Sequence, residues 1–369
     1  MKNSTFSFYD KATAFTAAVI ILLTCFATAN ANKIKATAVQ AVLNITKNTA
    51  QPLEALVDNF SSAGGKSDSD SVLVEAALNE LAVTPKDIKQ LISSAEKNSK
   101  NDIEDGKISE KQYDKSNAKI GNVSIRNTTS TQQNINFLKY YEEKPDINIK
   151  DKDSPAVLIF HTHTTETYEL LDRGWYAQDQ LTRSNSADRN MIRVGIEIKE
   201  QLEKGGYKVI HDTEIHDTKY TGAYAHSRKS IEKILKENPD IQIVLDIHRD
   251  AIELDNGTRI KPTATVHGKK AAQLMIITGC EEGKVTDFPD WEYNLTFALK
   301  LQSVIEENHP GLMRPLFFCQ RKYNMDLTHN NLLIEVGSCA NTLEEATYSG
   351  RLLGDSLVKL LDEQMKKED

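Results

Sequence analysis

Apolar positions in the C-terminal part of the chain follow two alternating patterns. Short continuous apolar runs, typical of buried strands, occupy residues 156–160, 207–210, 241–247, 273–278 and 331–336. Between them, apolar residues recur at the spacing of an amphipathic helix over residues 188–204, 224–235, 290–307 and 342–361. This alternation predicts one α/β domain over residues 154–369, with a mixed, mostly parallel sheet and helices on both faces.

One long uncharged apolar run, residues 12–29, lies near the N-terminus. Its length is at the short end of the about 17–25 residues that a transmembrane helix needs. Lys2 and Lys11 precede the run and favour a cytoplasmic N-terminus, with the rest of the chain outside. Small residues at 27–31 have the spacing of a signal-peptidase site. We therefore expect residues 1–31 to be a membrane anchor or a cleaved signal, and the remaining chain to be exported.

The region between the anchor and the α/β domain is polar. Residues 32–92 contain short amphipathic stretches, and a pair of helices is expected over residues 71–92. Residues 93–134 are rich in Lys, Asp, Ser and Asn, and their few apolar residues have no period. Such a segment buries too little surface to offset its ordering entropy. The composition predicts a mostly disordered tether within residues 93–153.

Composition and charge exclude several classes of protein. With 39% hydrophobic and 27% charged residues, the chain is neither collagen-like nor a multi-span membrane protein. The net charge of -8 disfavours a large nucleic-acid-binding surface. The four cysteines form no CxxC motif, so we interpret them as small buried residues, with Cys319 and Cys339 as a possible bridge. The chain has no GxSxG motif for a serine hydrolase and no Gly-rich phosphate loop.

Metal-binding side chains follow two of the predicted strands, where sites of open α/β sheets form. The segment His161-Thr162-His163-Thr164-Thr165-Glu166 comes directly after strand 156–160. The HxxE spacing of His163 and Glu166 lets both side chains converge on one ion, and His248, at the end of strand 241–247, supplies a third ligand. Three such ligands with an open fourth position are typical of catalytic zinc. His161 is an alternative or supporting member of this site.

Glu335 lies inside the apolar run 331–336, where an unpaired carboxylate carries a large desolvation cost. We interpret Glu335 as the general base that activates water at the metal, and a structural pair with an arginine is the alternative. Asp246 or Asp250 is expected to orient the metal-binding imidazoles. Arg249 is a candidate for binding a substrate carboxylate, with a surface pair to Asp250 as the alternative.

The remaining histidines are weaker candidates. His211 with Asp212 follows the strand at 207–210 and is an alternative metal pair. His216 lies further along the same segment, and His226 falls in a predicted helix. We interpret both as solvated or hydrogen-bonded side chains.

Taken in order, these motifs resemble those of the stage II sporulation protein P family. The matching segments are 161–166, 194–195, 246–250, 291–294, 310–314, 323–327, 333–337 and 341–346, within about residues 155–365. The segments Asp246-Ile247-His248-Arg249-Asp250 and Leu333-Ile334-Glu335-Val336-Gly337 carry most of the resemblance. Two departures are Met325, where the family pattern has glutamine, and the ending Gly337-Ser338-Cys339.

The resemblance implies a peptidoglycan hydrolase of endospore formers, with amidase and endopeptidase activity and a catalytic domain similar to zinc-dependent N-acetylmuramoyl-L-alanine amidases. It further implies a role in forespore engulfment beside stage II sporulation proteins D and M, and a retained membrane anchor rather than a cleaved, secreted form. By analogy with related amidases, Asp188 competes with Glu166 as the carboxylate ligand. Arg249 and Arg314 are candidates for binding stem-peptide carboxylates. The alternatives are a metallocarboxypeptidase-like peptidase and a non-catalytic cell-wall-binding protein.

Overall fold

The structure, a computed structural model, describes residues 68–365 of the chain. The chain divides into two compact units, Met1–Glu80 and Leu81–Asp369, and the second is described by itself below. The first is represented by most of helix α4 (Asp68–Ala82). The predicted anchor over residues 1–31 lies outside the described residues. Between residues 68 and 365, none of the helices has the length and apolar character that a membrane span requires.

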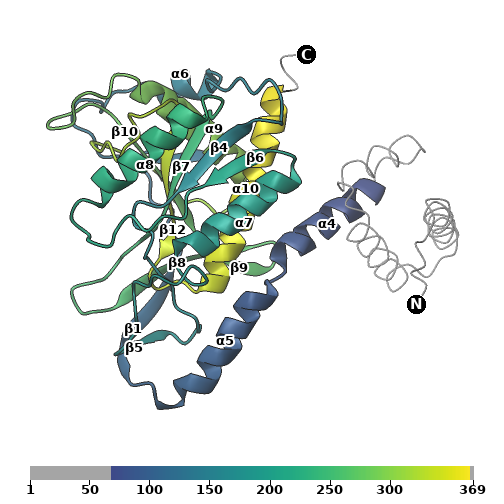
Figure 1. Ribbon diagram of the computed structural model, residues 1–369, viewed down its shortest axis with the longest axis vertical. Helices are drawn as coiled ribbons and strands as arrows, with labels where there is room; N and C mark the ends of the chain where they lie inside the picture. The colour runs from purple at the N-terminus through teal and green to yellow at the C-terminus, as the bar shows by residue number, and fades with distance from the viewer. Residues whose placement is uncertain (1–67, 366–369) are drawn as a thin grey trace, which may run out of the picture. The chain divides into compact units, whose positions relative to one another are not determined.

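A mixed sheet forms the centre of the second unit, and Figure 1 labels its strands β4, β6, β7, β10 and β12. The sheet has eight strands in the order β2-β3-β11-β10-β12-β7-β4-β6. Strands β12, β7, β4 and β6 pair in parallel, as do β3, β11 and β10, whereas β10 and β12 are antiparallel. The strand bounds are β2 Ala118–Ile120, β3 Val123–Asn127, β4 Pro155–Phe160, β6 Lys208–His211, β7 Ile243–Asp250, β10 Leu274–Gly279, β11 Leu316–Cys319 and β12 Asn331–Ser338. The predicted α/β class with a mixed, mostly parallel sheet is confirmed.

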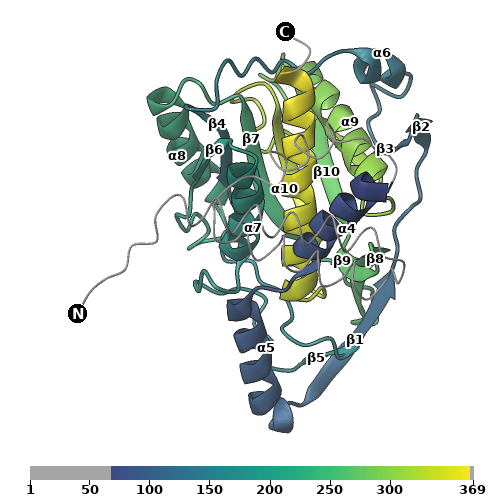
Figure 2. The same ribbon diagram turned by 90° about the vertical axis from the view of Figure 1, so that its right-hand side faces the viewer.

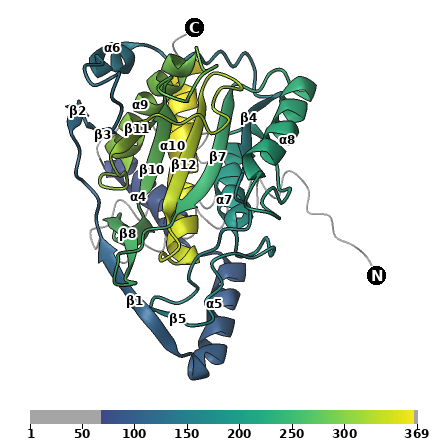
Figure 3. The same cartoon turned by 90° about the vertical axis from the view of Figure 1, so that its left-hand side faces the viewer.

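Helices cover both faces of this sheet, as the alternating pattern predicts. Helices α7, α9 and α10 lie on one face, and α8 lies on the other (Figures 2 and 3). Ile231 of α8 packs into a buried apolar cluster with Leu158, Phe160 and Val244 of the sheet. The helix bounds are α5 Lys86–Asn98, α6 Phe137–Glu142, α7 Met191–Lys204, α8 Ala223–Glu237, α9 Trp291–Asn308 and α10 Leu343–Met365.

Local sequence signals explain where the helices next to the site begin. The side chain of Asn190 accepts a hydrogen bond from Ile192 N at the start of α7. At the start of α10, Glu345 N donates to Thr342 Oγ1 at 3.2 Å, and Thr342 N donates to Glu345 Oε2 at 3.1 Å. These reciprocal bonds form a capping box, which satisfies backbone N–H groups that have no partner within the helix.

The prediction of a mostly disordered tether within residues 93–153 is wrong. Strand β1 (Glu104–Lys111) pairs with β5 (Trp175–Ala177) and β8 (Arg259–Val266), in a second sheet completed by β9 (Lys269–Ala272). Strand β3 pairs with β11, and its Val123 and Ile125 are 0% exposed. A polar segment of this kind does not need a hydrophobic core of its own. Its strands add to sheets whose buried apolar side chains are supplied mainly by the other strands.

The described cysteines behave as small buried residues. Cys280, Cys319 and Cys339 are all buried and carry free thiols. A bridge between Cys319 and Cys339 is therefore absent, and the alternative considered from the sequence is wrong.

Candidate metal centre and active site

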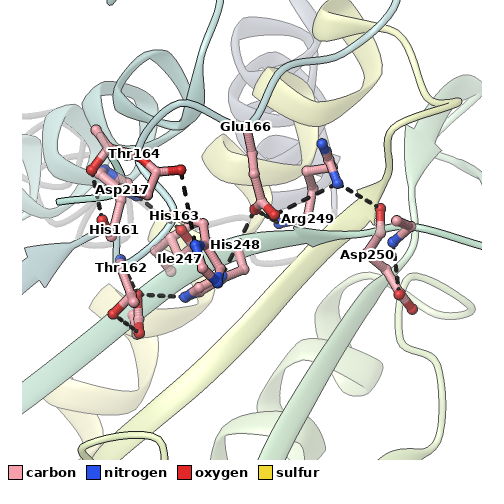
Figure 4. Close-up of polar contacts among 12 residues, drawn as sticks. His161, Thr162, His163, Thr164, Glu166, Asp217, Ile247, His248, Arg249 and Asp250 are labelled. Atoms are coloured by element: carbon pink, nitrogen blue, oxygen red, sulfur yellow. Dashed lines mark hydrogen bonds and ion pairs between the residues drawn. The ribbon is translucent and has the colours of Figure 1, made fainter. Parts of the chain in front are cut away.

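Three neighbouring parallel strands bring the predicted site residues to one edge of the large sheet. Strand β4 ends at Phe160, so residues 161–166 follow it directly, and β7 carries His248 near its carboxyl end. In β12, Glu335 lies in register with His248. The carboxyl ends of parallel strands share an edge, and Figure 4 shows His163, Glu166 and His248 gathered there.

The cluster contains the donor set of a zinc site. His248 Nδ1 lies 3.7 Å from Glu166 Oε2. The rings of His163 and His248 are nearly perpendicular, with centroids 5.3 Å apart. His163 Nδ1 is buried and has no hydrogen-bond partner, which is costly unless a ligand occupies it. Two imidazoles and a carboxylate suit zinc, so these residues fit the implied ion.

The donor atoms of His163, Glu166 and His248 are not yet close enough together for all three to bind one ion. Within residues 68–365, three metal-binding donor atoms lie within 4.8 Å of one another only in a separate group, formed by Glu214, His216 and His226. His163 stacks on Tyr220, with parallel rings and centroids 4.8 Å apart. Its ring therefore has to shift toward Glu166 and His248 before all three bind one ion.

Protonation differs between the two histidines. Burial and the neighbouring His248 lower the pKa of His163, so its ring is neutral and has a lone pair to donate. Burial lowers the pKa of His248 too, but the carboxylates of Asp246, Glu166 and Glu335 outweigh it and raise this pKa to about 9. Asp246 Oδ1 lies 2.7 Å from His248 Nε2. Asp246 therefore orients the ring so that Nδ1 faces Glu166.

Glu335 has the environment of a group whose proton affinity is raised. Its Oε2 is buried and makes no hydrogen bond. Burial raises the pKa of Glu335 to about 8, the cationic His248 and Arg314 oppose this rise, and Asp250 and Glu166 add to it. A carboxyl group whose pKa lies near neutrality is suited to exchanging protons with water and with a leaving group.

A bulge in β12 directly follows this carboxylate. The register of β12 against β7 shifts between Glu335 and Ser338. Gly337 has φ +64° there, in the left-handed region that favours glycine. Bulges of this kind are frequent next to active sites, and this one lies directly after Glu335.

His161 lies beside the cluster but faces away from it. Its Nδ1 bonds Ile247 O at 2.9 Å, and its Nε2 lies 2.8 Å from His211 Nε2. Burial and the neighbouring His211 lower the pKa of His161 to about 3, so the ring is neutral. Both nitrogens are already used within the protein. His161 therefore supports the strand ends, and the structure offers no donor atom of this residue to the ion.

Asp188, the alternative carboxylate, is not part of the cluster. Its Oδ1 accepts hydrogen bonds from Ser186 Oγ at 2.6 Å and from Arg189 Nε at 3.4 Å, and its side chain is 47% exposed. Of the two carboxylates considered from the sequence, the structure places Glu166 beside His248.

The two arginines predicted to bind substrate both have hydrogen-bond partners within the protein. The guanidinium of Arg249 donates to Thr167 O at 3.2 Å and to Thr182 O at 2.9 Å, and its backbone N donates to Glu166 Oε2 at 3.2 Å. Arg314 Nη1 donates to Asp250 Oδ2 at 3.0 Å. Both arginines are buried. Arg249 therefore positions Glu166, and Arg314 positions Asp250, whereas binding of a substrate carboxylate by either arginine stays a prediction.

Several neighbours of His163 were not predicted from the sequence. Asp217 Oδ2 lies 3.9 Å from His163 Nδ1, and this carboxylate accepts hydrogen bonds from Thr165 and Arg183. Tyr220 covers one face of the His163 ring and is 69% exposed. Asp217 and Tyr220 come from a loop 54 to 57 positions downstream of His163, where no periodicity marks them. Only its position after the strand that ends at His211 hinted at this loop.

The fold and the cluster define an α/β protein with a candidate His/Glu metal site at the carboxyl ends of its central strands. The chain belongs to the stage II sporulation protein P (SpoIIP) family, whose model matches residues 71–358. It is 29% identical over 215 residues to stage II sporulation protein P of Bacillus subtilis (strain 168), an alignment that covers 55% of this chain and 50% of that protein. The chain thus spans about half the length of this curated relative.

Solved structures of amidases show a weak likeness to this chain. An N-acetylmuramoyl-L-alanine amidase from Clostridium difficile 630 is 16% identical, with a TM-score of 0.33, and the match covers 59% of this chain and 100% of the amidase. The CwlD amidase from Clostridioides difficile, solved with the GerS lipoprotein, is 12% identical, with a TM-score of 0.35, and the match covers 58% and 100% of the two chains. At these TM-scores the likeness carries no conclusion about activity.

Proposed function

We propose that this protein is a zinc-dependent peptidoglycan hydrolase that cleaves amide bonds of the cell wall during sporulation. The observation that carries this proposal is that His163, Glu166 and His248 gather at the carboxyl ends of adjacent strands (Figure 4). Glu335 lies in register with His248 on the neighbouring strand β12. Membership of the stage II sporulation protein P family supports the cellular context. The scissile bond is that of an N-acetylmuramoyl-L-alanine amidase, with stem-peptide cross-links as the endopeptidase alternative.

The chain's own residues divide the work of hydrolysis. His163, Glu166 and His248 would hold zinc, which supplies a Lewis acid for the scissile carbonyl and lowers the pKa of water. Asp246 and Arg249 keep His248 and Glu166 in place. Glu335 takes a proton from the attacking water and returns it to the leaving amine, because its raised pKa suits both transfers.

The proposed location follows from the part of the chain outside the structure. The uncharged run at residues 12–29 would hold the protein in the cell membrane, with the hydrolase domain outside the cytoplasm. Cleavage after the run, which would release a shortened soluble protein, is the alternative. In this position the enzyme would meet peptidoglycan directly, with stage II sporulation proteins D and M as proposed partners in forespore engulfment.

Digestion of purified sacculi, with mass analysis of the soluble products, tests the activity. Amidase action releases stem peptides that end in a free L-alanine amine, whereas endopeptidase action cuts cross-links and leaves the peptides on the glycan. Loss of single C-terminal residues from free peptides would indicate a metallocarboxypeptidase instead. Sacculi that remain intact while the zinc-loaded protein is folded would contradict the proposal.

A further inference from the structure

A second group of metal-binding side chains lies outside the proposed catalytic cluster. Glu214 and His216 lie in the segment after β6, and His226 lies in the first turn of α8. One donor atom from each lies within 4.8 Å of the other two. His216 Nδ1 is 2.9 Å from His226 Nδ1, and His226 Nε2 is 3.7 Å from Glu214 Oε1. His216 is buried, whereas the other two side chains are about half exposed, so an ion can reach the group from solvent.

A buried carboxylate orients the inner histidine of this group. Asp212 Oδ2 lies 3.1 Å from His216 Nε2 and also accepts a hydrogen bond from Ser230 Oγ at 2.7 Å. Asp212 Oδ1 accepts a further hydrogen bond from Glu214 N at 3.0 Å. The Asp212 carboxylate accepts the Nε2 proton of His216, which leaves a lone pair on Nδ1. This is the carboxylate–histidine arrangement that supports metal ligands.

We propose that Glu214, His216 and His226 bind a second divalent ion of the zinc class. Two ligands of one tetrahedral zinc lie roughly 3.3 Å apart. The two Nδ1 atoms, 2.9 Å apart, therefore need to separate only slightly. Glu214 Oε1 lies 3.7 Å from the other ring nitrogen of His226, so this half-exposed side chain has to turn toward Nδ1 to complete the site as the third donor. Water fills the remaining position.

A matched arrangement elsewhere in the fold shows what distinguishes this group. His267 Nε2 lies 2.8 Å from His309 Nδ1, and His309 Nε2 lies 3.2 Å from Asp355 Oδ2. This hydrogen-bonded row of one carboxylate and two imidazoles matches the row formed by Asp212, His216 and His226. Among the described residues, however, no third metal-binding donor lies close enough to join it. It therefore serves as an internal control, because a histidine pair alone is satisfied by its hydrogen bond.

The second ion would stabilise the loop that carries the proposed catalytic ligands. Thr164, which lies between His163 and Glu166, donates from Oγ1 to Glu214 O at 2.9 Å. His216 N donates back to Thr164 Oγ1 at 3.2 Å. An ion that fixes Glu214 and His216 thus fixes the backbone against which residues 161–166 pack. The role is structural, and it does not depend on the proposed hydrolase activity.

Zinc content per folded chain, measured by elemental analysis after equilibration with buffered zinc, tests the second site. The wild-type protein is expected to bind two ions. His226→Gln and Glu214→Gln, which change half-exposed side chains, are each expected to bind one. His267→Gln is expected to bind two, and thermal unfolding should show that zinc raises the melting temperature of His267→Gln more than that of His226→Gln.

The variant His248→Ala distinguishes zinc bound at the proposed catalytic cluster from zinc bound at the second site. It is expected to lose one ion, and the double variant His248→Ala/His226→Gln to lose both. A single ion that is lost in His248→Ala but retained in both His226→Gln and Glu214→Gln would overturn the second site. A single ion lost only in those two variants would uphold the second site and overturn zinc binding at the catalytic cluster.

Discussion

Glu335 of β12 and His248 of β7 are register partners on adjacent parallel strands, and each changes the proton affinity of the other. The carboxylate of Glu335 helps to raise the pKa of His248 to about 9, and the imidazolium of His248 limits the rise in the pKa of Glu335 that burial causes. This pair joins the proposed metal ligands to the proposed base.

Replacing Glu335 by glutamine separates proton transfer from metal binding. Glu335→Gln keeps the shape of the side chain but cannot accept a proton, so hydrolysis of sacculi should fall by about 10²–10⁴-fold. Zinc content should stay at the wild-type value, as measured by elemental analysis. Glu232→Gln, on the exposed surface of α8, is the matched control and should keep full activity. If Glu335→Gln lost zinc as well, Glu335 would be a ligand and not the base.

The two candidate carboxylate ligands give opposite expectations. Glu166→Gln should lower zinc content and activity together, because Glu166 is buried and 3.7 Å from His248 Nδ1. Asp188→Asn should change neither, because Asp188 bonds only Ser186 and Arg189 in the structure. Zinc loss in Asp188→Asn with retention in Glu166→Gln would show that the loop carrying Asp188 rearranges when metal binds.

The stability of the zinc-free protein should depend on Glu335 with a defined sign. The folded-state pKa of Glu335 is raised from 4.5 to about 8, so between these values the folded state holds a proton that the unfolded state has released. Its contribution to stability therefore falls as pH rises from about 4.5 to 8. Chemical denaturation with chelator should show Glu335→Gln gaining stability relative to wild type over this interval. A stability difference that does not vary with pH would contradict the raised pKa.

Gly195 in α7 leaves the space that the pair of His161 and His211 occupies. A Cβ built on Gly195 would lie 2.5 Å from His211 Nε2 and 2.7 Å from His161 Nε2. Gly195→Ala should therefore destabilise the protein by about 1–3 kcal/mol, the usual cost of overpacking a core. Lys199→Ala on the same helix is the control, since Lys199 pairs only with Glu203 in this structure at 35% exposure. Equal melting temperatures for the two variants would show that the rings move aside without cost.

Removing β1, β2 and β3 should weaken the α/β unit. A chain of residues 135–369 lacks the buried Val123 and Ile125, each of which contributes roughly 1.5–3 kcal/mol when fully buried. It should unfold at a lower denaturant concentration than a chain of residues 81–369. Equal denaturant midpoints for the two chains would show that residues 81–134 add no stability, as expected of a tether.

The parts of the fold with strong periodicity could be predicted from the sequence. The apolar run 331–336 forms β12. The expectation that sites form at the carboxyl ends of the strands placed His163, Glu166 and His248 at one edge, where the structure has them. Strand β3 could not be predicted in the same way, because Val123 and Ile125 are its only buried side chains and its partner β11 is far away in sequence.

The charged residues of the site show a second limit of sequence reasoning. The residue type of Arg249 suggests an anion-binding group, and its Nη1 does lie 3.6 Å from Glu166 Oε1. Its guanidinium also donates to the backbone carbonyls of Thr167 and Thr182, and no pattern in the sequence marks these partners. Asp217 and Tyr220 approach His163 from a loop whose path depends on tertiary packing. The ligand type was therefore predictable, whereas the groups that position the ligands were not.

Removal and return of zinc test the central claim most directly. The release of peptide from sacculi should stop when a chelator strips the protein, and should return when zinc is added to the wild type. In His248→Ala, which lacks one proposed ligand, added zinc should restore no activity although the protein remains folded. Full hydrolysis by the stripped wild-type protein, or by His248→Ala, would contradict the proposed zinc hydrolase.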